Sequence, residues 1–442
     1  MKNEFYKKME PMFHLIEHKY KEVSPIEIIL LHLARGNTFN MRVVGLEGVK
    51  KFRKENADSS ITFKPNHFSE ADFVMLALLF RENDMRVLTE GGSNLFLDNI
   101  DIFRDLMPLY VEPHLKEALN SHSLSISQYL SERGAFKVFR EPTSIKQNDG
   151  SEIQLGIKDI LSLMRTYRYH LVKEREMYVT FPGYSSIKAD VNDPQKKNGF
   201  KTGRSYTGKI DGYHHLPFQM DIEASLYTDV DVYVVDVNIA YVPVLEDENF
   251  GELARLHKEG ASQDDIYRND LGYIMNRFCS HKNTGEMSIK FGKPFKIDVS
   301  SLKEGKNGRK IKDAAYNLAS DTFVKSISMQ PVFPANIYFT AFDKEFNGIS
   351  IEKFREKIDL LRAYLKILST GEDRCDIDLH YILDYNNQII SVDEIINRTF
   401  HVFNSFDKRI TSLKEGIFVV DNKDVAQQYR NHTSHFFEAF PG

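Results

Sequence analysis

Residues 61–80, ITFKPNHFSEADFVMLALLF, decide the fold of this chain. A β-compatible run at 61–63 precedes a proline, and an apolar run suited to a helix fills residues 73–80. The stretch therefore predicts a strand, a short loop and a helix. His67 falls on the loop, where a side chain can reach a substrate, and Asp72 falls in the first turn of the helix.

His67 and Asp72 can meet only if the helix begins between them. On a continuous helix their separation corresponds to a rotation of about 500°, which points the two side chains in different directions. Ser69 supplies the start, because its hydroxyl can accept an unpaired backbone N–H as an N-cap. The carboxylate could then hold the imidazole in one tautomer and leave the other ring nitrogen to remove a proton from a hydroxyl. The simpler interpretation is that Ser69 and Asp72 form only a capping box.

Length and composition indicate an ordinary globular protein. The 442 residues predict two or three domains, and a hydrophobic fraction of 42% is enough for a sizeable core. The net charge of -5 argues against a general nucleic-acid binder. Cys279 and Cys375 form no metal motif and indicate reduced thiols in a cytosolic protein. No signal peptide is expected, and no apolar run approaches the roughly 20 residues of a membrane span.

The sequence N-H-x-S-E-A-D at 66–72 resembles the first signature block of the glycerol-3-phosphate acyltransferase family, which belongs to the glycerolipid acyltransferases marked by H-x4-D. Later segments resemble further blocks of that family and follow in the same order. These segments are 134–140, 203–209, 230–244, 287–295 and 429–437. The resemblance covers residues 45–440 and implies a peripheral, bacterial-type acyltransferase.

The third block departs from the family pattern. The strand expected at 177–181 ends in Pro182-Gly183, and the motif resumes only at 203–209, after an insertion over 183–202. In the family, a glutamate of this block is assigned a contact with the acyl acceptor. That glutamate is missing here, so the contact is not predicted. The arginine often found at the position of Tyr206 is also absent.

The resemblance implies transfer of a fatty acyl group from acyl-CoA or acyl carrier protein to the sn-1 hydroxyl of glycerol 3-phosphate. His67 would act as the base and Asp72 would orient it. A guanidinium can fork onto phosphate oxygens, so basic and hydroxyl side chains of the second and third blocks are expected to hold the phosphate. These are Arg140, Arg204, Ser205 and Lys209. No metal or cofactor is expected.

Three alternatives stay open. The acceptor could instead be lysophosphatidic acid or dihydroxyacetone phosphate. The missing glutamate makes a non-catalytic lipid or acyl-carrier binding protein conceivable. Residues 203–209 also have the G-x4-G-K spacing of a P-loop, but Ile210 stands where the magnesium-binding Ser or Thr is required, which disfavours nucleotide binding.

The expected fold is a mixed α/β sheet flanked by helices. We expect an N-terminal helical segment at 1–45, an acyltransferase domain at 46–305 and a C-terminal helical domain at 306–442. The N-terminal segment would either pack on the core or lie on a membrane surface. The protein would be cytoplasmic and peripheral on the inner face of the cell membrane.

Apolar spacing predicts three further helices. The first spans 157–175, and the second spans 351–370 and is stopped by Gly371. The third begins after Ser391, which forms a capping box with Glu394, and continues past residue 410 to a stop at Gly416. Near the C-terminus, His432 and His435 have no third ligand at a sensible spacing, so we expect both to be structural.

Overall fold

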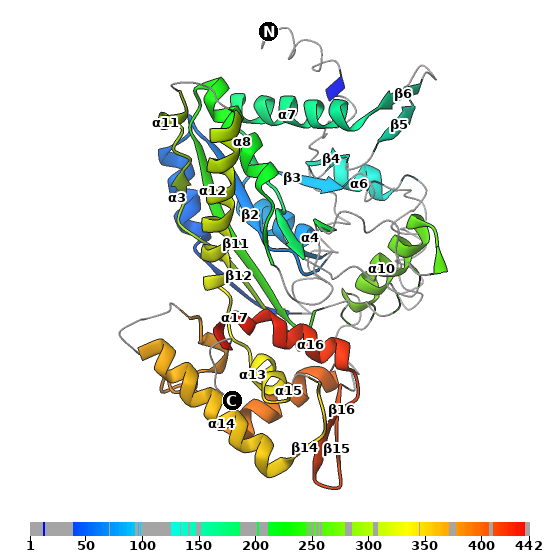
Figure 1. The fold of residues 1–442 in the computed structure, drawn as a ribbon, viewed down its shortest axis with the longest axis vertical. Helices are drawn as coiled ribbons and strands as arrows, with labels where there is room; N and C mark the ends of the chain where they lie inside the picture. The colour runs from blue at the N-terminus through cyan, green and yellow to red at the C-terminus, as the bar shows by residue number, and fades with distance from the viewer. Residues whose placement is uncertain are drawn as a thin grey trace.

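The structure is a computed structural model of the chain (Figure 1). It describes residues 12–13, 39–69, 71–92, 96, 98, 125–132, 134–139, 142–146, 152–185, 201–202, 211–244, 247, 249, 252, 256, 259–278, 285–303, 308–343, 345–370, 377–405 and 410–437. Apart from residues 12–13, residues 1–38 of the N-terminal helical segment expected at 1–45 lie outside this part of the chain, as do both cysteines. The expectation is wrong at its end, because residues 39–44 form a strand that pairs with residues 285–290.

Within the described residues, eight strands form the central sheet. They are β1 (Phe39–Val44), β2 (Ser60–Pro65), β3 (Val87–Gly92), β4 (Ala135–Val138), β7 (Met177–Val179), β11 (Val232–Val242), β12 (Gly285–Phe291) and β13 (Phe295–Lys296). Their order is β1-β12-β11-β2-β7-β3-β4, and β13 pairs with β11. The strands from β11 to β4 are mutually parallel, whereas β12 and β13 run antiparallel to β11. The α/β class predicted from the sequence is confirmed.

Burial on both faces explains the sequences of the two central strands. Every residue of β2 is buried, and in β11 only Tyr233 is half-buried. Strands covered on both faces are expected to be nearly continuous apolar runs, and β11 fits this with valine, isoleucine, alanine and tyrosine at most positions. The polar exceptions, among them Lys64, Asp236 and Asn238, are buried as well.

Helices cover both faces of the sheet. One face carries α3 (Leu46–Glu55) and α4 (Ala71–Glu82), and the other carries α7 (Ile157–Lys173), α8 (His215–Thr228) and α12 (Gly308–Ser328). Phe63 of β2 packs on Phe80 of α4 with a ring-centroid distance of 4.7 Å. Tyr178 of β7 points the opposite way, into the cluster formed with Leu163 and Phe218. Figure 1 shows α8 and α12 side by side in front of the sheet. The helix expected at 157–175 is confirmed as α7.

The C-terminal part of the chain closes one edge of the sheet (Figure 1). It contains α13 (Pro334–Thr340), η5 (His380–Ile382), α14 (Ile351–Thr370), α15 (Val392–Ser405), α16 (Lys423–His432), α17 (Ser434–Phe437) and the small sheet of β14 (Ile349–Ser350), β16 (Ile417–Val420) and β15 (Thr411–Lys414). The Tyr429 hydroxyl of α16 accepts a hydrogen bond from the Val244 N–H, just beyond β11, at 2.7 Å. α12 begins just after the domain boundary expected at residue 306. It packs against α8 over the central sheet, so this helix belongs with the sheet.

The helix expected at 351–370 is confirmed as α14, with Phe354, Ile358, Leu361 and Leu365 buried. The third expected helix is wrong at its end. α15 stops at Ser405, and residues 411–414 form a hairpin strand that pairs with β16 through a turn at Gly416, whose φ is 78°. The apolar residues near 410–413 matched a helical spacing, but cross-strand pairing to 417–420 places them in a sheet.

The remaining described elements are α6 (Ile126–Glu132), α10 (Gln263–Phe278), α11 (Ser300–Lys303), the hairpin of β5 (Thr143–Lys146) and β6 (Glu152–Leu155), and the small sheet of β10 (Gly212–Tyr213), β8 (Gly183–Ser185) and β9 (Lys201–Thr202). Among the helices in the described ranges, none combines the length and apolar character needed to cross a membrane.

Candidate active site

The loop between β2 and α4 is built around a capping box. The Ser69 hydroxyl accepts a hydrogen bond from the Ala71 N–H at 3.0 Å. The Asp72 carboxylate reaches back and accepts from the Ser69 N–H at 3.1 Å. Each side chain therefore satisfies a backbone donor that the first helical turn leaves unpaired. The predicted strand, loop and helix, and the start of the helix at Ser69, are confirmed.

The same carboxylate also holds the imidazole of His67. Oδ2 of Asp72 lies 2.9 Å from His67 Nδ1 and also accepts from the Phe68 N–H at 2.8 Å. Oδ1 accepts from the hydroxyl of Tyr241, which lies near the end of β11. Asp72 is fully buried, with both oxygens occupied. The capping contact and the contact with the histidine, which the sequence offered as alternatives, are therefore both made by Asp72.

This contact fixes the tautomer of His67. A carboxylate can only accept hydrogen bonds, so Nδ1 must carry the hydrogen and Nε2 of a neutral ring is the acceptor. The ring packs on Phe181, the second residue after β7, with a centroid distance of 4.7 Å. No residue in the described part of the chain donates a hydrogen bond to Nε2. This nitrogen can therefore take a proton from a hydroxyl placed beside it.

Asn66 locks the loop to the neighbouring strand. Its side-chain NH₂ donates to the Ile239 carbonyl at 2.8 Å, and its side-chain oxygen accepts from the Ile239 N–H at 2.7 Å. The amide thus continues the pairing of β2 with β11 after Pro65 has ended the backbone ladder. Asn66 therefore fixes the position of the next residue, His67.

A network of charged side chains is buried beside β2. Lys64 Nζ lies 2.7 Å from Asp221 Oδ2, and Asp221 Oδ1 accepts from Arg168 at 2.8 Å and from the Tyr178 hydroxyl at 2.9 Å. Arg168 also donates to Glu90 Oε2 at 2.8 Å. Burial lowers the pKa of Lys64 to about 8, while the Asp221 charge opposes that shift. Two cations and two anions balance in this space, as buried charges require.

Sequence reasoning missed this network and Tyr241. One signal for the network was present, because Lys64 places a charge within the predicted strand, between Phe63 and Pro65. No local signal marked Tyr241, which stands 169 residues from Asp72 in the chain. Its role follows from the pairing of β11 with β2.

The two described ends of the insertion in the third block pair with each other in a small sheet of their own. β8 follows β7 and pairs with β9, so that Tyr184 lies opposite Thr202, and β10 pairs with the other side of β8. The chain therefore comes back beside β8 at residue 202, directly before the resumed motif. The predicted phosphate ligands Arg140, Arg204, Ser205 and Lys209 lie outside the described residues.

The C-terminal helix α16 closes over the loop. The ring of His432 lies against Phe68 at a centroid distance of 4.4 Å. Burial lowers the pKa of His432 to about 3, so this ring stays neutral at physiological pH. His435 Nε2 lies 3.1 Å from the Ile327 carbonyl. Both histidines are thus engaged in packing, and no described group of three His, Cys, Asp or Glu side chains could hold a metal ion.

Comparison with known proteins found no family model that matches the chain and no match among curated proteins. The functional assignment therefore rests on the residues and on the geometry of the loop.

Proposed function

We propose that this protein is an acyltransferase that moves a fatty acyl group from a thioester to the hydroxyl of glycerol 3-phosphate. The observation that carries the proposal is the pair of His67 and Asp72 at the carboxyl edge of a parallel sheet, with Nδ1 held by the carboxylate and Nε2 without a hydrogen-bond donor among the described residues. Ligands of open α/β sheets bind at this edge. A buried carboxylate on one ring nitrogen is the arrangement that makes the other nitrogen a general base.

The proposed reaction is a direct transfer. Nε2 of His67 takes the proton from the acceptor hydroxyl as its oxygen forms a bond to the thioester carbonyl carbon. The negative charge of Asp72 stabilises the resulting imidazolium. When the tetrahedral intermediate collapses, the carbon–sulfur bond breaks and the proton passes from His67 to the leaving thiolate. The products are an ester and a free thiol, and no oxidant, metal or covalent enzyme intermediate is needed.

The acceptor phosphate requires cationic ligands. We assign this role to Arg140, Arg204 and Lys209, with Ser205 as a hydroxyl donor, on the resemblance of their segments to the second and third family blocks. The return of β9 to β8 supports the assignment for the third block, because it brings the chain back to the end of β7 just before Arg204. Lys64 and Arg168 are committed to Asp221 and Glu90, so they are poor candidates for this role.

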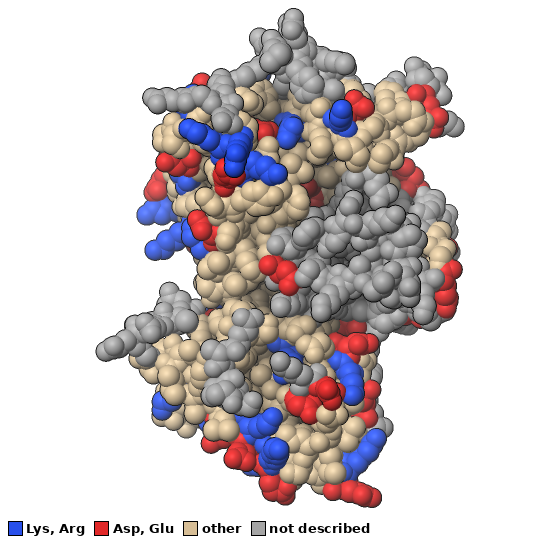
Figure 2. Space-filling model, in the orientation of Figure 1, with Lys and Arg blue, Asp and Glu red and all other residues tan. Residues whose placement is uncertain are grey.

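The proposal also includes peripheral contact with an anionic membrane surface. Figure 2 shows Lys and Arg side chains gathered over the end of the molecule at which α12 begins. The first turn of α12 there carries the exposed residues Arg309, Lys310 and Lys312. Basic side chains at a surface are attracted to anionic lipid headgroups.

The test is an acyl-transfer assay with a labelled acyl thioester and a panel of acceptors. Glycerol 3-phosphate, lysophosphatidic acid, dihydroxyacetone phosphate and glycerol are offered separately, and ester formation and thiol release are both followed. The proposal predicts the highest kcat/KM with glycerol 3-phosphate. A higher value with another acceptor would reassign the substrate. Tight binding of glycerol 3-phosphate without ester formation or thiol release would make the protein a binding protein and refute the enzymatic assignment.

A further inference from the structure

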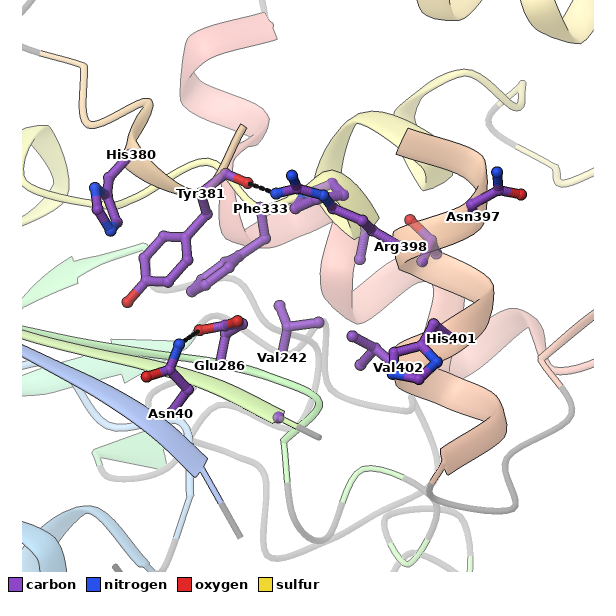
Figure 3. A pocket seen from close by; sticks show the side chains of 14 residues that line it. Asn40, Val242, Glu286, Phe333, His380, Tyr381, Asn397, Arg398, His401 and Val402 are labelled. Carbon is purple, nitrogen blue, oxygen red and sulfur yellow. Dashed lines mark hydrogen bonds between the residues drawn. The ribbon is translucent and has the colours of Figure 1, made fainter. Parts of the chain in front are cut away.

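A second hollow lies at the same edge of the sheet as His67. It is a cavity of about 680 Å³ between the ends of β1, β11 and β12 and the C-terminal elements α13, η5 and α15 (Figure 3). This volume falls within the range of roughly 300–1,000 Å³ that is typical of small-molecule sites. Nothing in the proposed reaction at His67 accounts for it.

The cavity and the His67–Asp72 pair share one strand, β11. Val242 lines the cavity, and the preceding residue, Tyr241, donates to Asp72. Successive side chains of a strand point to opposite faces, so the cavity and the pair flank the end of β11 on its two sides. Asn40, Glu286 and Val242 stand opposite one another on β1, β12 and β11. The wall at Glu286 is two strands from β2, or about 10 Å at the usual strand spacing.

The lining combines an apolar floor with unused polar groups. Figure 3 shows Phe333, Val242 and Val402 facing the same space as Glu286. Glu286 accepts from the Asn40 side chain at 3.1 Å through one oxygen, and no described residue donates to its other oxygen. Burial raises the pKa of the Glu286 carboxyl, against the opposing effects of the Asn40 hydrogen bond and a nearby guanidinium. A ligand that donates a hydrogen bond to this carboxyl group would stabilise it.

Two more polar side chains at the cavity have free capacity. Neither the ring of His380 nor the side-chain amide of Asn397 makes a hydrogen bond within the described ranges. An amide can both donate and accept, and a neutral imidazole can do the same through its two nitrogens. Together with Glu286, these groups suit a ligand that itself carries both donors and acceptors.

The charges of the lining exclude two other occupants. Arg398 already donates to the Glu394 carboxylate and to the Tyr381 carbonyl, and Glu286 lies across the cavity from it. A nucleotide or another polyanion would therefore meet more carboxylate than free cation. A hydrocarbon chain would bury the second oxygen of Glu286 without a hydrogen bond, at a cost of about 1–3 kcal/mol. The occupant expected from the lining is uncharged, with polar groups on an apolar frame.

We propose that this cavity receives the pantetheine arm of the acyl thioester, an inference that rests on the proposed acyl-transfer function. The arm is uncharged, and its two amides and its hydroxyls match the mixed donors and acceptors of the lining. Its geminal methyl groups match the apolar floor. Stretched out, its backbone is about four peptide units long, or roughly 13–14 Å. This exceeds the lateral separation from β2, and the arm would pass around the end of β11 to reach His67, because the cavity and the pair lie on its two sides. The same arm is carried by coenzyme A and by acyl carrier protein.

The test compares two donors with the same octanoyl group. Octanoyl-pantetheine carries the arm, and octanoyl-N-acetylcysteamine keeps the thioester but lacks most of it. Asn397→Trp places a bulky ring at an exposed position of the cavity, and Asn317→Trp makes the same change on the exposed side of α12 as a matched control. We expect Asn397→Trp to lower kcat/KM at least tenfold for octanoyl-pantetheine and to leave the short donor within twofold. Asn317→Trp should change neither value.

The two natural carriers and a binding measurement complete the design. Octanoyl-CoA and octanoyl acyl carrier protein should both lose activity in Asn397→Trp, and their kcat/KM values in the unmodified protein identify the preferred carrier. Free pantetheine should bind the unmodified protein in calorimetry and should not bind Asn397→Trp.

The outcomes test the assignment of the cavity separately from the proposed acyl transfer. Binding of pantetheine that Asn397→Trp abolishes, in a protein that transfers no acyl group, supports the cavity and refutes the proposed function. Acyl transfer that Asn397→Trp leaves unchanged, or slows equally for the long and the short donor, overturns the cavity assignment alone. Absence of both binding and transfer overturns both.

Discussion

Replacement of Asp72 by asparagine separates its two roles, because asparagine keeps the size of the side chain and loses the charge. The amide oxygen can take the Oδ2 position, toward which the donors of His67, Phe68 and Ser69 point. The NH₂ group then faces Tyr241, whose hydroxyl can rotate to accept a hydrogen bond. Asp72→Asn should therefore fold with the loop intact.

The size of both effects follows from the contacts. A hydrogen bond to a charged group contributes about 1 kcal/mol more than one between neutral groups. Three donors converge on Oδ2, so Asp72→Asn should lower the free energy of unfolding by roughly 3 kcal/mol. The imidazolium formed during transfer also loses its counter-charge, which should lower kcat by about 10²–10⁴-fold. Denaturant titration and acyl-transfer kinetics on the same preparation measure the two quantities.

α7 offers a matched control. The Asp159 side chain accepts from the Gly156 N–H at 3.1 Å in the same capping position, on a different helix. Asp159→Asn should lower stability by about 1 kcal/mol or less and leave kcat unchanged. If kcat of folded Asp72→Asn stays within threefold of the unmodified protein, Asp72 serves the helix alone and the catalytic role assigned to it is refuted.

Tyr241→Phe should lower the free energy of unfolding by about 1–3 kcal/mol, because it leaves one oxygen of the buried Asp72 without a donor; a loss below about 0.5 kcal/mol in denaturant titration would show that the contact is unimportant. Lys64→Met should lower it by about 3–5 kcal/mol, since it breaks a buried ion pair with Asp221, and full stability of this variant would contradict the buried network. His432 titrates at about pH 3 in the folded protein, against 6.5 when unperturbed. Between pH 6.5 and about pH 3 the unfolded chain therefore binds a proton that the folded protein does not. The free energy of unfolding decreases as the pH is lowered through this range. His432→Phe should remove up to about 1.4 kcal/mol of this loss per pH unit, and parallel pH profiles of the two proteins would show that the ring is not buried and neutral.

The strand, loop and helix around His67 could be predicted because each boundary has a local cause. Pro65 ends the ladder, Ser69 caps the helix, and the apolar run after Asp72 has a helical length. The C-terminal error has the opposite origin. Residues near 410–413 satisfy a helical spacing, but their structure is decided by pairing with 417–420 across a turn. Local spacing does not contain that pairing.

The rest of the candidate site depends on contacts between segments far apart in the chain. Tyr241 reaches Asp72 only because β11 lies beside β2. The partners of Lys64 come from α8 and the strand β7. A single sequence shows that a lysine lies within the predicted strand, but not which carboxylate neutralises it. The cavity at the end of β12 likewise forms only when the C-terminal helices dock on the sheet.

The most direct test of the central claim is the single-turnover rate of acyl transfer to glycerol 3-phosphate by His67→Ala, beside the unmodified protein. His67 lies on a loop and its ring contacts Phe181 alone among the described aromatic rings, so the variant should fold, which its denaturation midpoint verifies. Loss of the general base should lower the rate by about 10²–10⁴-fold. A folded His67→Ala protein that transfers the acyl group at a rate near that of the unmodified protein would contradict the account.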